Sequence, residues 1–109
     1  MANVKFDSNS RVSLSNADSG SGNTVFGYNA GASIDSGTDN NVFIGHNVAD
    51  ATLADAIENV AVGFGALSAL TQGDKNIAIG YSAGESMTTG YQNCIIGARA
   101  GDLITDANN

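Results

Sequence analysis

The chain has 109 residues, and its four Lys and Arg residues against eleven Asp and Glu residues give a formal net charge of −7. A surface of this charge repels phosphate backbones, so we expect no nucleic-acid partner. Hydrophobic residues make up 42% of the chain and charged residues 14%, which excludes a typical disordered protein. One cysteine cannot form an internal disulfide, so a single small domain must find its stability in a regular structure.

The first 22 residues stand apart from the rest of the sequence. Residues 4–6 and 11–15 alternate like two short strands, and residues 19–22 are a Ser-Gly linker, so we expect a segment that caps or links the structure that follows. The opening residues lack the basic and apolar stretches of a signal peptide, which predicts assembly in a cytoplasm. No run of eighteen apolar residues occurs, so we expect no membrane insertion.

From residue 23 to residue 109, one pattern occurs five times: Asn, an apolar stretch, Gly, and then small residues. Five copies at spacings of 17 or 18 residues indicate a repeat domain. The copies begin at Asn23, Asn41, Asn59, Asn76 and Asn93, and their glycines are Gly27, Gly45, Gly63, Gly80 and Gly97.

Each copy contains two short apolar stretches separated by turn residues. Two strands and two turns in 17 or 18 residues are typical of one coil of a parallel β-solenoid, so the predicted fold is an all-β solenoid, or β-roll, of about five coils. Residues 49–57 could locally be read as a helix, but their position within a repeat favours an irregular loop. We expect turns such as residues 49–59 to face solvent and to carry any recognition.

Stacked coils place equivalent residues about 4.8 Å apart, in columns. In the first strand of each coil, two positions that are two residues apart point to the same face. We assign the columns that these positions form to the core: Val42, Ile44, Val60, Val62, Ile77, Ile79, Cys94 and Ile96. The residue between them is also apolar, and a strand apolar on both faces is buried on both faces, which predicts association. The candidate subunit interface combines this middle column with an aromatic column: Val25, Phe43, Ala61, Ala78, Ile95, Tyr28, His46, Phe64 and Tyr81.

The Asn and Gly columns have structural interpretations beside functional ones. The Asn column could be a polar recognition stripe, but a ladder of side-chain amides bonded from coil to coil is favoured. The Gly column could approach a ligand, but a tight corner with positive φ, or close packing against a neighbour, is favoured. The aromatic column could bind sugar rings, although stacking for stability or a subunit contact is favoured.

No residue pattern indicates an enzyme, a cofactor or a metal site. His46 is the only histidine and has no partner at a catalytic or ligating spacing, and Cys94 is interpreted as a small buried hydrophobe. The acidic residues could bind calcium between coils, but no calcium-loop pattern is present. The six-residue apolar period of left-handed β-helix acyltransferases is absent, and one threonine, Thr24, does not make an ice-binding stripe.

The sequence Asn-Ile-Ala-Ile-Gly-Tyr-Ser-Ala-Gly at residues 76–84 resembles the head repeats of trimeric autotransporter adhesins and, more closely, the tandem repeats of bacteriophage tail-fibre proteins. Residues 6–16 also resemble segments that precede such repeats in phage fibres. The resemblance implies a homotrimer of β-rolls around one axis, with a role in reaching or gripping the host surface. The lack of a recognisable signal peptide favours the phage fibre, which assembles in the host cytoplasm and is extracellular, in the virion, after release.

The expected partners are therefore other copies of the chain in a homotrimer, a stacked copy or a downstream fibre region, and a host surface glycan or protein. A structural spacer or self-stacking filament, without receptor contact, remains the alternative function. An autotransporter-type adhesin head is the lower alternative.

Overall fold

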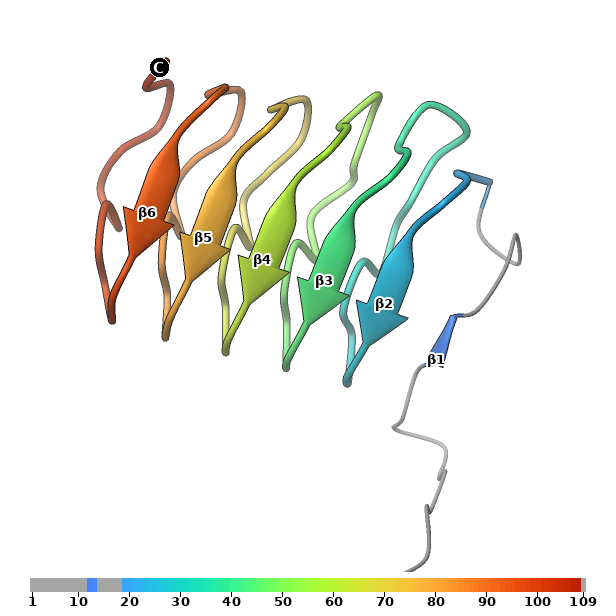
Figure 1. Cartoon of the computed structure of the whole chain (residues 1–109), viewed down its shortest axis with the longest axis horizontal. Helices are drawn as coiled ribbons and strands as arrows, with labels where there is room; N and C mark the ends of the chain where they lie inside the picture. Colours follow the sequence, from blue (N-terminus) through green and yellow to red (C-terminus); the bar gives the residue numbers. More distant parts are fainter. Residues whose placement is uncertain (1–11, 14–18, 109) are drawn as a thin grey trace, which may run out of the picture.

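The computed structural model describes residues 12–13 and 19–108, and these form an all-β structure. The strands are β1 (Val12–Ser13), β2 (Thr24–Phe26), β3 (Val42–Ile44), β4 (Val60–Val62), β5 (Ile77–Ile79) and β6 (Cys94–Ile96). They form one sheet in the order β1-β2-β3-β4-β5-β6 (Figure 1). The strand expected at residues 4–6 lies outside the described residues.

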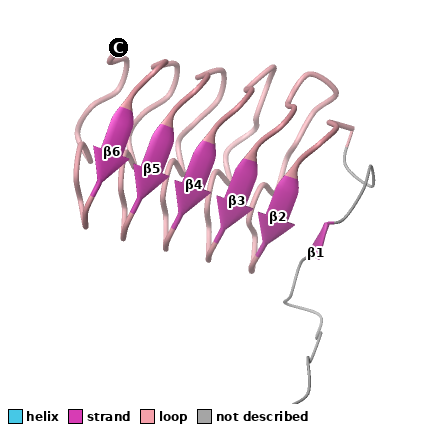
Figure 2. Ribbon diagram, viewed as in Figure 1, coloured by secondary structure: helices cyan, strands magenta, loops and turns pink. Residues whose placement is uncertain are grey.

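Strands β2 to β6 are parallel and in register, each one coil after the last. Thr24 pairs with Val42, Val42 with Val60, and the pattern continues through Ile77 to Cys94. The chain between consecutive strands runs out, turns and returns beside its neighbour (Figure 2). The prediction of a parallel β-solenoid is confirmed, with about four turns joining the five parallel strands.

Strand β1 differs from the others because it pairs antiparallel with β2. Val12 lies opposite Phe26, and Ser13 lies opposite Val25. This strand belongs to the segment of residues 1–22 that we expected to cap the coils. It occupies the edge of β2 that no preceding coil covers.

Each coil has one strand and not the predicted two. After each strand the backbone takes positive φ at alternate residues, as at Gly63 (127°), Gly65 (66°) and Leu67 (51°). A strand needs consecutive extended residues, so the second apolar stretch forms a turn. Residues 49–57 form an irregular loop without helix, apart from an isolated bridge between Ser33 and Thr52.

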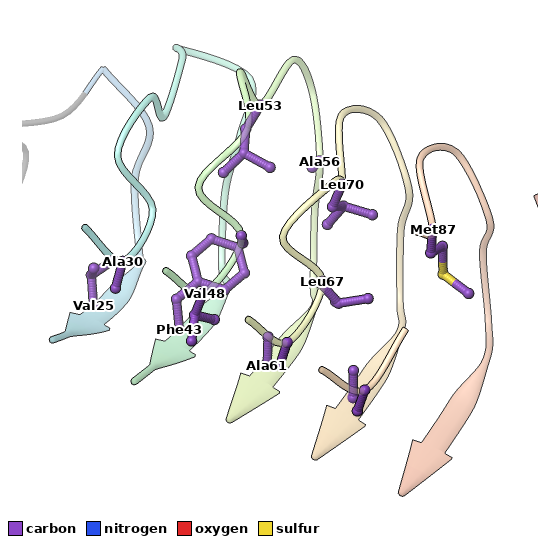
Figure 3. Close-up of a cluster of buried hydrophobic side chains, with 14 of the residues drawn as sticks. Val25, Ala30, Phe43, Val48, Leu53, Ala56, Ala61, Leu67, Leu70 and Met87 are labelled. Carbon is purple, nitrogen blue, oxygen red and sulfur yellow. The ribbon is translucent and has the colours of Figure 1, made fainter. Parts of the chain in front are cut away.

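The core lies between the strands and the turns behind them (Figure 3). The middle residue of each strand points inward, and none of the five is more than 7% exposed: Val25, Phe43, Ala61, Ala78 and Ile95. Leu53, Leu67, Leu70 and Met87, from the turns, fill the opposite side and are fully buried. Every buried side-chain nitrogen or oxygen among the described residues has a hydrogen-bond partner.

The predicted assignment of the two strand faces is therefore wrong. The eight residues expected in the core (Val42, Ile44, Val60, Val62, Ile77, Ile79, Cys94 and Ile96) are exposed or partly exposed, on the outside of the sheet. The middle residues, expected at a subunit interface, are inside the coil instead. The reason is the width of the coil: with apolar turns as its second wall, it has room for one inward side chain from each strand.

Candidate functional site

The outer side of strands β2 to β6 is an exposed apolar surface. It carries the first and last residue of each strand, and we call these ten residues the outer face: Thr24, Phe26, Val42, Ile44, Val60, Val62, Ile77, Ile79, Cys94 and Ile96. Phe26 is 54% exposed and Ile96 is 63% exposed. The outer face contains no Asp, Glu, Lys or Arg, although the chain has a net charge of −7.

Two residues beyond each of β2 to β5, an aromatic ring packs against its neighbours in the adjacent coils, tilted in the first two pairs and stacked in the third. Ring centroids are 4.9 Å apart from Tyr28 to His46, 5.1 Å from His46 to Phe64, and 5.4 Å from Phe64 to Tyr81. This aromatic ladder ends at the fifth coil, where the equivalent residue is Ala98. The planes of Phe64 and Tyr81 are 13° apart, so the faces that these two rings turn toward each other are not open to a sugar.

The exposure of the aromatic ladder differs from that of the middle column with which it was grouped. Tyr28, Phe64 and Tyr81 are about half exposed, so these rings stay candidates for a subunit contact. His46 lies between two rings, and no group of three metal-ligating side chains occurs among the described residues. The arrangement therefore favours a packing role for His46, as one ring of the aromatic ladder.

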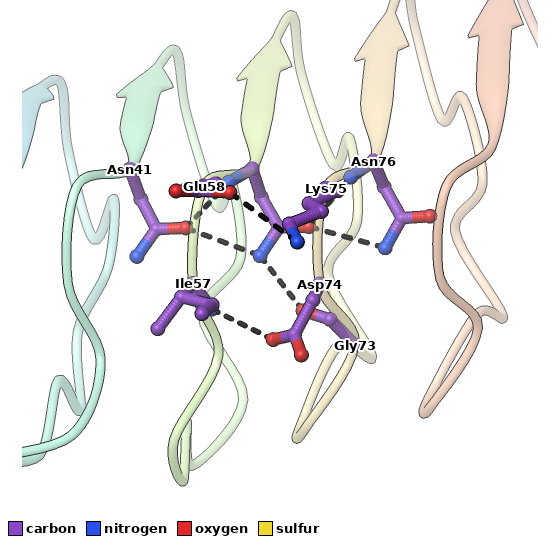
Figure 4. A network of polar contacts seen from close by, with 8 residues as sticks. Asn41, Ile57, Glu58, Gly73, Asp74, Lys75 and Asn76 are labelled. Carbon is purple, nitrogen blue, oxygen red and sulfur yellow. Dashed lines mark hydrogen bonds and ion pairs between the residues drawn. The ribbon is translucent and has the colours of Figure 1, made fainter.

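The Asn column forms a continuous ladder at the corner before each strand (Figure 4). Asn59 donates its backbone N–H to the Oδ1 of Asn41 at 2.8 Å and its Nδ2 to the same atom at 3.1 Å. Its own Oδ1 accepts the corresponding pair from Asn76, at 3.0 and 3.1 Å. Its Nδ2 also donates to the Gly73 carbonyl at 2.8 Å. Asn23 and Asn93 continue the ladder at its two ends.

The Gly column lies where neighbouring coils are too close for side chains. A Cβ on Gly63, whose φ is 127°, would lie 2.6 Å from the Gly80 carbonyl oxygen. A Cβ on Gly27, Gly45 or Gly80 would also meet the backbone of the next coil at less than 3.0 Å, whereas Gly97 has only the Ala100 Cβ nearby, at 3.8 Å. The geometry therefore gives this column a packing role between coils.

Several carboxylates hold turns in place. Asp35 accepts hydrogen bonds from the Thr38 hydroxyl at 2.7 Å and from the backbone N–H groups of Asp55 and Gly37. The Thr38 hydroxyl and the Asp55 N–H lower the pKa of Asp35 below its usual value. Asp74 accepts from the Ile57 N–H at 2.9 Å in the same way. Lys75 and Glu58 form an exposed pair at 3.8 Å, which contributes little to stability.

Two further expectations are corrected by the burial pattern. Cys94 is exposed on the outer face and is not a buried hydrophobe. The loop of residues 49–59, expected to face solvent, buries Ala49, Leu53, Ala56 and Asn59 completely. These residues complete the core of the longest coils, so only the remaining residues of the loop are available for recognition.

In two of the five parallel strands, residue size distinguishes the inner face from the outer face. In β4 and β5 the middle residues are Ala61 and Ala78, whereas the flanking residues are Val and Ile. The smaller side chain is inside in these two strands, whereas the larger Phe43 is inside in β3, so residue size distinguishes the two faces only in β4 and β5.

The part of the chain that the structure describes contains no helix able to cross a membrane. Comparison of the chain with protein-family models, with characterised proteins and with solved structures finds no match.

Proposed function

We propose that the chain is a subunit of a homotrimeric fibre of the bacteriophage tail-fibre type, in which the outer faces of three chains pack together around the fibre axis. The observation that carries the proposal is the uncharged, apolar outer face of a strongly acidic chain. Exposed apolar surfaces of this kind mark interaction sites. The repeat resemblance supports the number of chains and the fibre role.

Charge supports the same face as the contact between chains. Bringing copies with a net charge of −7 together is unfavourable wherever their carboxylates meet. On the outer face no carboxylate needs to lose its water, and each large side chain that leaves water there contributes about 1 kcal/mol or more. The acidic turns then remain on the outside of the assembly and keep the fibre in solution.

A solution mass tests the assembly. Sedimentation equilibrium should give three times the chain mass of 11.0 kDa, and Ile79→Asp on the outer face should give single chains that keep the native circular dichroism spectrum. Gln72→Asp adds the same charge on an exposed turn and should leave the trimer intact. A wild-type chain that sediments as a monomer contradicts the proposal.

The adhesive part of the role is tested separately from assembly. A fibre that contacts the host predicts binding of the intact chain to bacterial cells or to a surface glycan. A correctly assembled trimer that binds neither favours the alternative role of a structural spacer.

A further inference from the structure

The aromatic ladder (Tyr28, His46, Phe64 and Tyr81) is a second exposed surface, separate from the outer face. Its side chains come from the corners that follow β2, β3, β4 and β5, and all four are exposed. The ring centroids follow one another at 4.9 to 5.4 Å, close to the spacing of stacked strands. The rings therefore form a narrow, straight strip of aromatic surface that runs along the stack over four coils.

The rings of this strip are not packed face to face throughout. The planes of Tyr28 and His46 are 49° apart, and those of His46 and Phe64 are 31° apart. Two rings tilted in this way do not cover each other's faces completely, so part of an aromatic face is open in each of these pairs. The face of an aromatic ring is the negative part of its quadrupole and attracts cations.

Carboxylates border the ladder on the side of the turns. Asn29 directly follows Tyr28, and its Nδ2 donates to the Asp50 Oδ2 at 3.3 Å. In the fourth coil, the Glu85 N–H donates to the carbonyl of Ser82, the residue after Tyr81, at 3.3 Å. Asp50 and Glu85 thus lie on the turns beside the ladder, in a chain with a net charge of −7. A positively charged ligand on the ladder is therefore attracted and a negatively charged one is repelled.

One basic residue lies at the far end of the ladder. The Arg99 N–H donates to the Tyr81 carbonyl at 2.7 Å, so its side chain begins beside the last ring. Lys75, the other basic residue that the structure describes, pairs with Glu58. The charge beside the ladder is thus negative along the turns and positive at one end, which gives a test of opposite sign.

We propose that the aromatic ladder binds flat, elongated aromatic cations, which lie along the stack in contact with several rings. The shape of the ligand follows from the ladder, because a straight row of rings offers most contact to a long planar molecule. Its charge follows from the bordering carboxylates Asp50 and Glu85 and from the open faces of the tilted rings. An anion of the same shape meets the same rings but the opposite field.

The site is independent of the proposed trimer. The four rings lie beyond the ends of the strands, whereas the outer face consists of residues within the strands. The length of the ladder is also set inside the chain, because the fifth coil is present and has Ala98 at the equivalent place.

The test titrates thioflavin T, a flat aromatic cation whose fluorescence rises when its rings are held in one plane, into the full chain at low salt. We expect a saturable rise that weakens severalfold in high salt, because salt screens the attraction of the carboxylates. The control dye is 8-anilinonaphthalene-1-sulfonate, an aromatic anion. It should not displace thioflavin T from the ladder.

Variants locate the site. Phe64→Ser removes a central ring and should weaken thioflavin T binding by about tenfold. Tyr91→Ser removes a half-exposed ring that precedes β6, outside the ladder, and should leave the binding unchanged. Glu85→Gln should weaken binding by about threefold, and Arg99→Gln should strengthen it by about the same factor. The circular dichroism spectrum of each variant shows whether it is folded.

Three results would overturn the proposal. The first is the lack of a saturable signal from thioflavin T up to its solubility limit, and the second is its displacement by the anionic dye. The third is unchanged binding in Phe64→Ser or, if that variant does not fold, in both Glu85→Gln and Arg99→Gln. Sedimentation of the same samples reads the trimer separately. A trimer that does not bind contradicts the ligand site alone, and a monomer that binds contradicts the trimer alone.

Discussion

The inner and outer residues of the same strands differ in environment although both are apolar. In β5, Ala78 is fully buried between strand and turn, whereas its neighbours Ile77 and Ile79 are 39% and 38% exposed. The larger side chains are thus outside and the smaller one is inside. Size does not decide burial throughout the fold, because Phe43 is fully buried at the middle of β3; burial follows the middle position of each strand. The surplus of apolar residues lies on a surface that the single chain does not cover.

A charge placed on each face of β5 in turn should give the largest difference in stability between the inner and the outer face. Ala78→Glu puts a carboxylate into the core without a partner and should destabilise the fold by more than about 4 kcal/mol. Ile79→Asp, one residue away, should change the stability of the isolated chain by less than about 1 kcal/mol because its side chain reaches water. Thermal unfolding followed by circular dichroism, at a dilution at which the wild type sediments as single chains, measures both, and an Ala78→Glu chain as stable as the wild type would contradict the placing of Ala78 in the core.

A covered coil and an end coil are compared by substituting glycine. Gly63→Ala drives a methyl group against the Gly80 carbonyl and should cost about 3 kcal/mol or more. Gly97→Ala has a similar φ, 125° against 127°, but open space beside it, so only the backbone strain of about 1 to 3 kcal/mol applies and the loss should be smaller than at Gly63. Urea denaturation gives the two free energies, and equal losses would show that backbone strain alone, without contact between coils, requires the glycines.

Substitutions in the Asn ladder also compare a covered coil with the last coil. The expected loss of stability at the buried Asn59 is smaller than that at Gly63. Asn59→Ala removes the amide that bonds to coils on both sides and should lower the free energy of unfolding by about 3 kcal/mol. Asn93→Ala removes bonds to the preceding coil and to its own coil, and should cost about half as much. Urea denaturation distinguishes the two positions, and a loss at Asn93 that exceeds the loss at Asn59 would contradict the ladder's account of stability.

The exposed turns should respond to pH more than the core does. Hydrogen bonds from Thr38 and Asp55 lower the pKa of Asp35 below its usual value of 3.8, so the charged form is favoured in the folded chain. Its contribution to stability is therefore complete above the pKa of the unfolded state and is lost as the pH falls through the lowered, folded pKa. In Asp35→Asn, unfolding free energies measured from neutral pH to about pH 2.5 should fall less steeply in acid than in the wild type.

The repeat itself could be predicted because identical residues at a fixed spacing must lie in columns. An Asn amide has both a donor and an acceptor, so for the column of Asn59 and its equivalents a ladder was favoured over a recognition stripe, and the structure contains the ladder. The choice of inner face failed because an apolar strand such as Ile77–Ile79 has no polar side to mark the outside. The small size of Ala61 and Ala78 was a local signal of it in β4 and β5.

The path of the turns could not be predicted from residue type. Leu67, Ser82 and Arg99 take positive φ at positions where a glycine would be expected. In the column of Ser82 and Arg99 two of the five coils have Asn, and in the column of Leu67 three of the five coils have Gly. The hydrogen bonds between coils hold these residues in that conformation. Leu67 donates its N–H to the Ala83 carbonyl, and Ser82 donates its N–H to the Phe64 carbonyl. Tertiary contacts therefore override the local preference of the backbone.

The Asn amides all point the same way along the stack, each donating toward the coil before it. Hydrogen bonds arranged head to tail polarise one another, so the Asn ladder is polar along the axis of the stack. Under tension along this direction the rungs bear the load in series, and every rung carries the full force. Mechanical failure should therefore begin at the least buried coil and proceed one 17-residue or 18-residue step at a time.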